Sequence, residues 1–186
     1  MELNAAIFGR RATRRYTQQS VDEITLERLM NAAVHAPSAV NQQPWAFTVV
    51  RDQGILDLAS QRVKSHLIAN VPAVAASGHV HGQVTDPDFH VFYHAPVLIL
   101  ISATAQGPWI VEDCALAAEN LMLAAYGAGL GSCWIGLAQG WLNTPAGRQA
   151  LDTPAAWISM APIIVGHPRA AAAPVPRNEP VVRWVG

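Results

Sequence analysis

The sequence has little charge and few cysteines. Charged residues make up 13% of its 186 residues and the formal net charge is −1 at pH 7, so bulk electrostatics give no attraction to nucleic acid or to an anionic membrane. The two cysteines, Cys114 and Cys133, form neither a disulfide framework nor a CxxC pair. We therefore expect a reducing, cytoplasmic location, with neither nucleic acid nor a membrane as a partner.

Long hydrophobic runs and a secretory signal are also absent. The longest clear apolar run, residues 95–105, is shorter than the roughly 18 residues of a membrane-spanning helix. The first eleven residues place arginines after a short apolar stretch, the reverse of a signal peptide. The chain is nevertheless 51% apolar, which excludes intrinsic disorder and indicates that surface is hidden in an oligomer or around a large ligand.

The length fits one domain, which we assign to residues 1–186. The apolar spacing predicts helices at 24–34, 55–69 and 108–126, and strands at 46–50, 97–103, 133–137 and 157–165. This alternation predicts an α+β fold with a central mixed β-sheet flanked by helices. The polar residues 78–94 are expected to form a loop or lid. The residues after Pro168 predict an extended arm that lies on another part of the structure, such as a partner subunit.

Basic residues concentrate near the N-terminus. Arg10, Arg11, Arg14 and Arg15 are four of the twelve basic residues of the chain and fall within six positions. Arginine offers a planar fork of donors that suits phosphate, and Thr13 adds a hydroxyl. A solvated basic surface explains the same cluster. A nucleic-acid-binding arm is disfavoured, because the rest of the chain has no basic face with interleaved aromatic residues.

A second polar segment, residues 35–45, joins a helix that stops at Pro37 to a strand. It contains Ser38, Asn41 and Gln43. Amides both donate and accept hydrogen bonds, so they suit the mixed edge of a heterocycle. Taken alone, however, the segment is better explained as a capped helix end followed by a turn.

A glycine-rich segment, residues 126–137, follows a helix and leads into a strand. Its spacing is not G-x-G-x-x-G, because Ser132 stands at the third glycine position, and its helix-to-strand order is the reverse of a dinucleotide-binding loop. A helix C-cap at Gly127 and a tight turn explain its first glycines. Gly136, inside the predicted strand, marks a close approach of the backbone to a ligand or another chain.

Taken together and in this order, the segments resemble the nitroreductase family of FMN-dependent enzymes, over residues of about 5–183. The family's R-R-S-x-R, A-P-S-x-x-N-x-Q-P-W and G-L-G-S-C-W-I-G segments correspond to residues 10–14, 36–45 and 129–136. In the family they hold the flavin phosphate, approach the isoalloxazine ring (often from the other subunit) and line the N5 side of the ring. A late G-x-P and a following arginine close the phosphate site. The resemblance therefore implies that FMN is bound by Arg10, Arg11, Ala12, Arg14, Pro37, Ser38, Asn41, Gln43, Trp134, Ile135, Gly136 and Arg177.

The resemblance also implies a function. Hydride would pass from NAD(P)H to flavin N5 and then to a nitroaromatic, a quinone or a similar small-molecule acceptor, with ping-pong kinetics. No side chain acts as a catalytic acid or base in this scheme, because the cofactor carries the chemistry. A homodimer with swapped arms and with FMN at the subunit interface is implied as well. Ala12 stands where the family commonly has serine, which removes one contact to phosphate, and Arg169 competes with Arg177 for the last one.

Other interpretations remain open. The same scaffold hosts flavin enzymes with different chemistry, namely dehalogenases, flavin-fragmenting enzymes and heterocycle dehydrogenases, and residues 78–94 would decide among them. A non-catalytic protein could instead use the arginine cluster for RNA or a phospho-ligand. His79, His81, His90 and His94 suggest zinc ligands, but no H-E-x-x-H pattern is present, and we predict no metal site.

Overall fold

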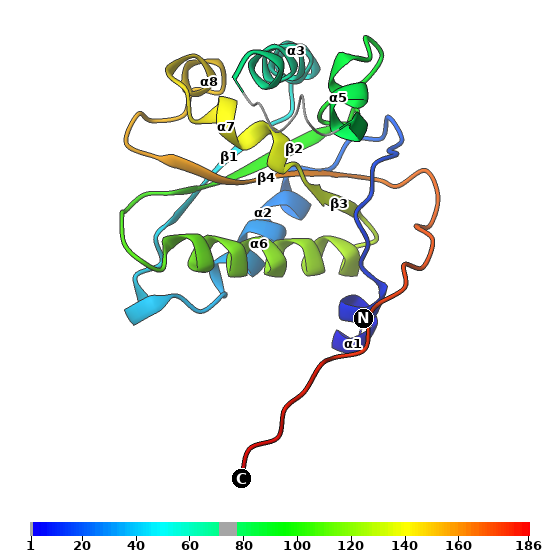
Figure 1. The fold of residues 1–186 in the computed structure, drawn as a ribbon, viewed down its shortest axis with the longest axis vertical. Coiled ribbons are helices and arrows are strands. Elements are labelled where there is room, and N and C mark those ends of the chain that lie inside the picture. The colour runs from blue at the N-terminus through cyan, green and yellow to red at the C-terminus, as the bar shows by residue number, and fades with distance from the viewer. Residues whose placement is uncertain (1, 71–77) are drawn as a thin grey trace.

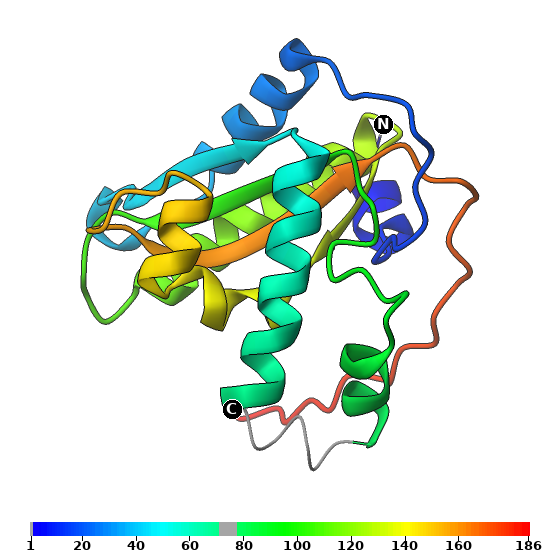
Figure 2. The same ribbon diagram turned by 90° about the horizontal axis from the view of Figure 1, so that it is seen from above.

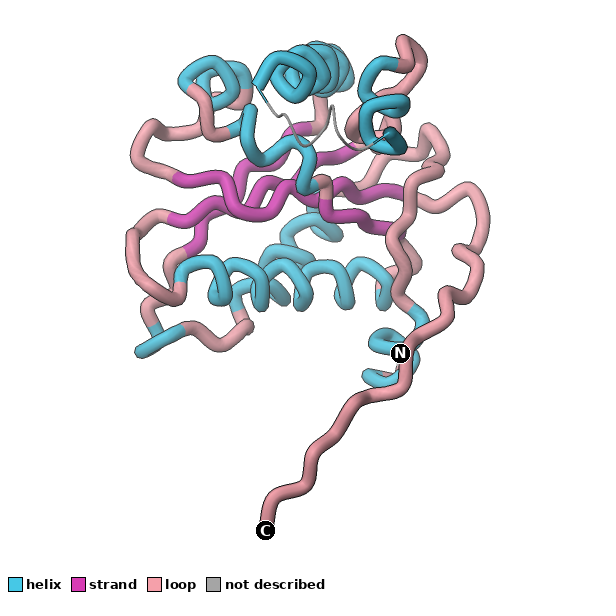
Figure 3. Tube along the Cα trace, viewed as in Figure 1, coloured by secondary structure: helices cyan, strands magenta, loops and turns pink. Residues whose placement is uncertain are grey.

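The computed structural model describes residues 2–70 and 78–186 (Figure 1). A four-stranded sheet with the order β1-β2-β4-β3 lies at its centre. The strands are β1 (Trp45–Val50), β2 (Val97–Ala103), β3 (Gly131–Trp134) and β4 (Ile158–Gly166). Helices cover both faces (Figure 3). The predicted α+β class, with a sheet flanked by helices, is confirmed.

The helices divide between the two faces of the sheet (Figure 1). One face is covered by α2 (Glu23–Val34) and α6 (Ile110–Gly127), and the other by α3 (Gln53–Asn70), α5 (Gly78–Thr85), α7 (Gln139–Leu142) and α8 (Pro145–Ala150). Figure 2 shows α3 crossing over the strands, with α5 beside it. The short α1 (Leu3–Gly9) packs on α6. None of the helices in the described ranges has the length and apolarity that a bilayer crossing requires.

The sheet is antiparallel, whereas the sequence predicted a mixed sheet. All three strand pairings are antiparallel. The strands β2 and β3 do run in the same direction, because the single helix α6 joins them, but β4 lies between them and pairs with both. The alternation of helices and strands in the sequence gives no sign of this insertion. Within the described residues, the one parallel pairing is an isolated bridge between Ala12 and Ser132.

The strand β2 is buried along its whole length because helices cover both faces of the sheet. Its side chains alternate between two cores, as the pleat of a strand requires. Ile99 and Ile101 face α2 and α6, whereas Leu98 and Leu100 face α3 and α7. The uninterrupted apolar run in the sequence is therefore the mark of a central strand.

Three local predictions are corrected. Residues 78–85 form α5 instead of a loop, and the turns are confined to residues 86–94. The strand β3 ends at Trp134, so Gly136 belongs to a short 3-10 helix, η2 (Gly136–Ala138), where the chain turns away from the sheet. After α6 it is Gly129, with φ of 75°, that takes the left-handed conformation by which helices commonly end, and Gly127 is the last helical residue.

The C-terminal arm has no regular secondary structure in residues 170–186 (Figure 1). All of these residues are exposed, and Trp184 exposes 91% of its surface. The helix α1 is similarly open, with Leu3, Ile7 and Phe8 exposed. The extended arm that the sequence predicts is confirmed, and the surface on which it lies stays a prediction.

Helix α2 begins with a cap that makes its stability depend on pH. The Asp22 carboxylate accepts hydrogen bonds from the Thr25 N–H at 2.8 Å and from the Thr25 hydroxyl at 2.7 Å, and these bonds lower the pKa of Asp22. Because the folded state has the lower pKa, this stabilisation is present above about pH 4 and is lost as the pH falls through the folded value.

We expect Asp22→Ala to lower the melting temperature at pH 7 by about 2–4 °C, the usual effect of a lost N-cap in a chain of this size. The difference from the unmodified protein should shrink on acidification below about pH 4. Thermal melts at pH 7 and at acidic pH measure both effects. Asp88→Ala, at another exposed aspartate, is the control. Equal melting of Asp22→Ala and the unmodified protein at pH 7 would contradict the prediction.

Candidate functional site

Two cavities lie beside β3. The first, of about 410 Å³, is lined by residues of α1, the end of α6, the start of β3 and the arm, among them Arg10, Arg11, Thr13 and Ser132. The second, of about 460 Å³, is lined by Arg14, Gln83, Val91, Tyr93, Cys133, Trp134, Ile135, Gly136 and Leu137. The N-terminal arginine segment thus contributes to both cavities.

The arginine segment runs along the edge of the sheet. Ala12 bridges Ser132, and the Thr13 N–H donates to the Ser132 carbonyl at 2.9 Å. Neighbouring side chains in such an extended segment point to opposite sides, so Thr13 lines the first cavity and Arg14 the second. The side chains of Thr13 and Arg14 therefore face different cavities.

Tyr16 anchors the end of the same segment. Its hydroxyl donates to the Thr13 carbonyl at 2.6 Å, and burial raises its pKa, so the phenol stays protonated and keeps this bond. Tyr16 also bridges Pro168, and the Arg169 Nε donates to the Tyr16 carbonyl at 2.7 Å. The end of β4 therefore fixes the position of Arg14.

The side chains of the four clustered arginines differ in their contacts. The Arg11 Nη1 donates to the carbonyls of Phe8 and Arg10 at 2.7 and 2.8 Å, so this side chain caps the end of α1. The Arg10 Nε lies 3.5 Å from the Glu119 carboxylate, and Arg14 stands over the Tyr93 ring, 5.9 Å from its centroid. Arg15 is exposed.

Three buried polar atoms near the first cavity lack a hydrogen-bond partner in the part of the chain that the structure describes, although one of them, the Arg10 Nε, lies within ion-pair distance of Glu119. They are the Arg10 Nε, the Arg11 Nε and the Ser132 Oγ. Buried donors of this kind are normally satisfied by a protein group, water or a ligand. An anion or ordered water at this place would satisfy them.

The predicted backbone contact to a ligand falls at the end of β3. The Ile135 N–H already donates to the Pro162 carbonyl at 2.8 Å, which leaves Gly136 as the backbone donor of this pair. Among the residues that the structure describes, none lies within 4 Å of the point where a side chain at Gly136 would begin, and Trp134 is exposed beside it. The backbone at Gly136 is thus open for a flat ligand to approach.

Cys133 is a buried thiol at the same cavity. Burial raises its pKa, and the nearby Arg14 and Arg10 oppose this effect without overcoming it. The thiolate, which is the reactive form, is therefore disfavoured.

The second predicted segment lies at the opposite edge of the sheet. Pro37, Ser38, Asn41 and Gln43 precede β1, whereas the arginine segment and Gly136 adjoin β3, and β2 and β4 separate the two. Figure 1 shows this separation. One chain therefore does not bring these two sets of residues together.

The loop before β1 is ordered and strained. The Ser38 hydroxyl accepts the Gln43 N–H at 2.9 Å, and the Asn41 Oδ1 accepts the Gln43 amide at 2.9 Å. Val40, Asn41 and Gln43 have φ of 47°, 55° and 49°, which is costly for side chains other than glycine, and Val40 exposes 98% of its surface. Strain of this kind often marks a functional segment.

Asp113, which the sequence analysis did not consider, anchors this loop. Its Oδ1 accepts the Ala39 N–H at 2.9 Å, whereas its Oδ2 is buried without a partner among the described residues. Asp113 lies in the first turn of α6, 74 positions away from Ala39. An aspartate at a helix start is common, so the sequence carried no signal for this contact.

The two C-terminal arginines differ in position. Arg169 contacts the arginine segment through the Tyr16 carbonyl, and its N–H donates to the Arg15 carbonyl at 3.0 Å. Arg177, the predicted phosphate contact, is exposed on the arm. The structure therefore places Arg169, and not Arg177, next to the clustered arginines.

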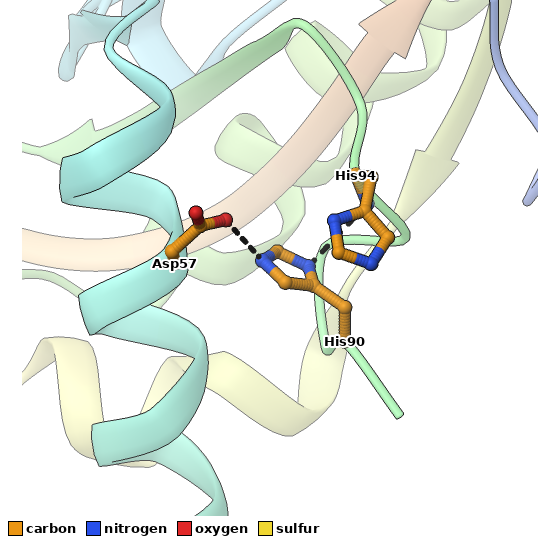
Figure 4. A group of neighbouring side chains, drawn as sticks. All are labelled: Asp57, His90 and His94. Atoms are coloured by element: carbon orange, nitrogen blue, oxygen red, sulfur yellow. Dashed lines mark hydrogen bonds and ion pairs between the residues drawn. The ribbon is translucent and has the colours of Figure 1, made fainter. Parts of the chain in front are cut away.

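Asp57, His90 and His94 form a separate group (Figure 4), with ligand-type atoms within 4.8 Å of one another. The His90 Nδ1 accepts the N–H groups of Phe92 at 3.1 Å and of His94 at 3.4 Å, so the ring proton lies on Nε2, which faces Asp57 Oδ1 at 3.1 Å. A metal ion at Nε2 would move this proton to Nδ1, against two N–H donors. These hydrogen bonds oppose metal ligation by His90. Two of the four histidines weighed above as zinc ligands lie in this group.

Residues 7–167 match the sequence model of the Nitroreductase family. The chain belongs to this family. A structural neighbour, a nitroreductase with bound FMN from Bacteroides fragilis, has a TM-score of 0.81 and 26% sequence identity, and the match covers 98% of this chain and 95% of that protein.

Curated relatives carry more than one name. A protein of Methanothermobacter thermautotrophicus with the provisional name NADH dehydrogenase/NAD(P)H nitroreductase is 32% identical over 142 residues, which are 74% of this chain and 62% of that protein. A 5,6-dimethylbenzimidazole synthase of Rhodospirillum rubrum is 28% identical over 192 aligned positions, covering 95% of this chain and 86% of that protein. Membership of the family is thus shown, and relatives of the chain are named for different reactions.

Proposed function

We propose that this nitroreductase-family protein, as one domain of residues 1–186, is an FMN-dependent oxidoreductase that accepts hydride from NAD(P)H and reduces a nitroaromatic, a quinone or a similar acceptor by ping-pong kinetics. The observation that carries the proposal is the second cavity, where Arg14 stands at one side and the open backbone of Gly136 at another. The likeness to an FMN-bound nitroreductase over nearly the whole chain supports it.

The residues present fit FMN at both ends of the cofactor. At the phosphate end, Arg10 and Arg14 would provide charge-assisted donors, and the Ser132 Oγ, buried without a hydrogen-bond partner among the described residues, calls for a polar ligand or water. Arg169 lies closer to this segment than Arg177 does. At the ring end, the Gly136 N–H would donate to N5 and stabilise an electron-rich ring.

When bound, FMN would supply the hydride chemistry at N5. The chain's own contribution is binding, orientation and exclusion of water. Because NAD(P)H and the acceptor would use the same face of the flavin in turn, ping-pong kinetics are expected.

We propose that the remaining ring contacts come from a partner subunit in a homodimer. Ser38, Asn41 and Gln43 are exposed or half-buried at the far edge of the sheet, so they would reach the cavity of a second copy instead of their own. The open apolar side chains of α1 and of the arm are consistent with surface that a second copy covers. The arm would swap onto that copy.

A second candidate function is a flavin enzyme of this fold with different chemistry. The similarity to a 5,6-dimethylbenzimidazole synthase over 95% of the chain favours keeping it. Such an enzyme would hold FMN but would not turn over NADH or NADPH with a nitroaromatic or quinone. A non-catalytic phospho-ligand or RNA-binding protein is less favoured, and it would bind no flavin.

The first test is a visible spectrum of the purified protein, with the heat-released cofactor identified by chromatography. We expect a yellow protein that releases FMN, oxidises NADH or NADPH, and gives parallel double-reciprocal plots with menadione as the acceptor. FMN without pyridine-nucleotide oxidation would favour the second candidate. A colourless protein that also fails to bind added FMN would overturn the proposal.

The anchor at Asp113 gives a further prediction. Asp113→Ala removes the acceptor for the Ala39 N–H, so the loop that carries Ser38 and Asn41 should loosen and FMN affinity should fall by about five- to tenfold, the effect of one buried hydrogen bond. Asn120→Ala removes a different hydrogen bond made by the same helix, from the Asn120 side-chain amide to the Ala32 carbonyl at 3.2 Å. This variant should leave FMN affinity unchanged. Fluorescence titration of the two apoproteins with FMN compares them. Equal FMN affinities in the two variants would show that the loop needs no anchor.

A further inference from the structure

One face of α3 binds the segment 86–94. Asp57, Ser60 and Lys64 are spaced so that they share this face of the helix. The buried Ser60 hydroxyl accepts the Val91 N–H at 2.9 Å. The Lys64 ammonium donates to the carbonyls of residues 86 and 89 at 2.6 and 3.0 Å. The segment is therefore held by side-chain contacts to a helix and does not pair with the sheet.

His90 organises the end of this segment (Figure 4). Its side chain is only 9% exposed. Its Nε2–H donates to Asp57, while its Nδ1 accepts the N–H groups of Phe92 and His94. The next two turn residues, Tyr93 and His94, have φ of 52° and 51°, a conformation that a bulky side chain adopts only when its surroundings enforce it. The imidazole of His90 contributes to that enforcement through these two bonds, together with the bond that the Tyr93 N–H donates to the His90 carbonyl at 2.9 Å.

The turn places Tyr93 at the second cavity. Val91 and Tyr93 line it together with Trp134 and Gly136, and the Tyr93 ring lies against Arg14. A change in the turn would therefore move a wall of the second cavity.

We propose that Asp57 and His90 are positioning residues that hold Tyr93 as a wall of the acceptor pocket, and that this wall relaxes when His90 takes up a second proton. The proposal rests on the proposed function, because it assigns the second cavity to the flavin and its acceptor. The physical reason for the relaxation is geometric. A proton on Nδ1 would face the two backbone N–H donors, so both of those hydrogen bonds would be lost.

The charges around His90 determine the pH range in which it becomes protonated and the turn is released. Burial lowers the pKa of His90, the neighbouring His94 and the Lys64 ammonium lower it further, and only Asp57 raises it. The folded pKa is therefore below the ordinary value of about 6.5. The turn is fully held above this value and is released as the pH falls through the lower folded pKa.

The test compares three variants of the holoenzyme. His90→Ala removes every contact of the ring. His90→Asn keeps an acceptor close to the position of Nδ1. Asp57→Asn keeps an acceptor for Nε2–H but removes the charge. His81→Ala, at an exposed histidine of α5, is the control. The measurements are hydrogen exchange at the amides of residues 92 and 94, FMN content, and the KM and kcat for menadione across pH.

We expect His90→Ala to raise both amide exchange rates and the menadione KM by about tenfold, as the loss of buried hydrogen bonds implies, with kcat within about twofold. In the unmodified protein we expect the KM for menadione to rise at acidic pH. His90→Asn should restore slow exchange and a low KM, and should remove that rise. Asp57→Asn should shift that rise to lower pH, because the charge that favours protonated His90 is gone.

Slow exchange in His90→Ala would overturn the proposal, and so would fast exchange with an unchanged KM. If His90→Ala does not fold, the pH dependence of exchange in the unmodified protein and in His90→Asn decides the question. Failure of the proposed function is distinguishable, because the protein would then lack FMN or fail to reduce menadione, whereas exchange at residues 92 and 94 would still report whether the turn depends on His90.

Discussion

Replacing both Arg10 and Arg14 with alanine is expected to yield a protein that purifies without FMN. Each hydrogen bond to a charged group contributes about 1.5–3 kcal/mol, so the loss of one such bond at each arginine should weaken FMN binding by about 10²- to 10⁴-fold. The effect should be large because Ala12 already lacks the hydroxyl that is common at this position in the family. Few other contacts to the phosphate would remain once both arginines are removed.

The matched control is Arg15→Ala combined with Arg28→Ala. Both of these arginines are exposed, so the change in net charge is the same while the cavities keep their arginines. The ratio of visible to ultraviolet absorbance measures FMN content, and fluorescence titration of the apoprotein gives Kd. Full FMN content in the Arg10 and Arg14 double variant would refute the phosphate assignment.

Gly166→Ala is expected to destabilise the protein and to weaken cofactor binding at the same time. A Cβ at Gly166 would lie 2.5 Å from Cδ of Pro96 and 2.9 Å from Cδ1 of Tyr16. Both neighbours are rings, and Tyr16 is buried, so neither can yield easily. Overpacking of this kind costs about 1–3 kcal/mol, which corresponds to a fall in melting temperature of about 2–12 °C.

The effect on FMN would follow from the position of Tyr16. If its ring is displaced, its hydrogen bond to the Thr13 carbonyl is strained and Arg14 loses its fixed place beside the cavity. Gly127→Ala is the control, because no atom of the described ranges lies within 4 Å of the added carbon there. Chemical denaturation and FMN titration of both variants measure the two effects. If Gly166→Ala and Gly127→Ala have the same free energy of unfolding, then β4 and Tyr16 can move apart without destabilising the fold.

The sequence predicted those parts of the fold that depend on local patterning. The apolar run of β2 and the alanine-rich α6 were placed to within about two residues of their observed bounds. The position of β4 between β2 and β3 was not predictable, because strand order is decided by packing between distant segments. The helical state of residues 78–85 was missed because a polar segment rich in histidine and glycine has no clear helical period.

The sequence likewise predicted some parts of the candidate site and missed others. The family resemblance identified the segments with Arg14 and Gly136, which the structure brings to one cavity. It did not reveal which arginines are used internally, because the role of Arg11 depends on the carbonyls at the end of α1. Asp57 and Asp113 were missed since each contacts its partner across more than 30 positions of sequence, and single aspartates on helices give no pattern.

The placement of the polar loop and the arginine segment at opposite edges of the sheet has a genetic consequence. In the proposed dimer, each chain would contribute its loop to one site and its arginines to the other. Two defective alleles, one altered in the loop and one in the arginines, would then complement each other, because a mixed dimer retains one site with both halves intact and concentrates both defects in the other.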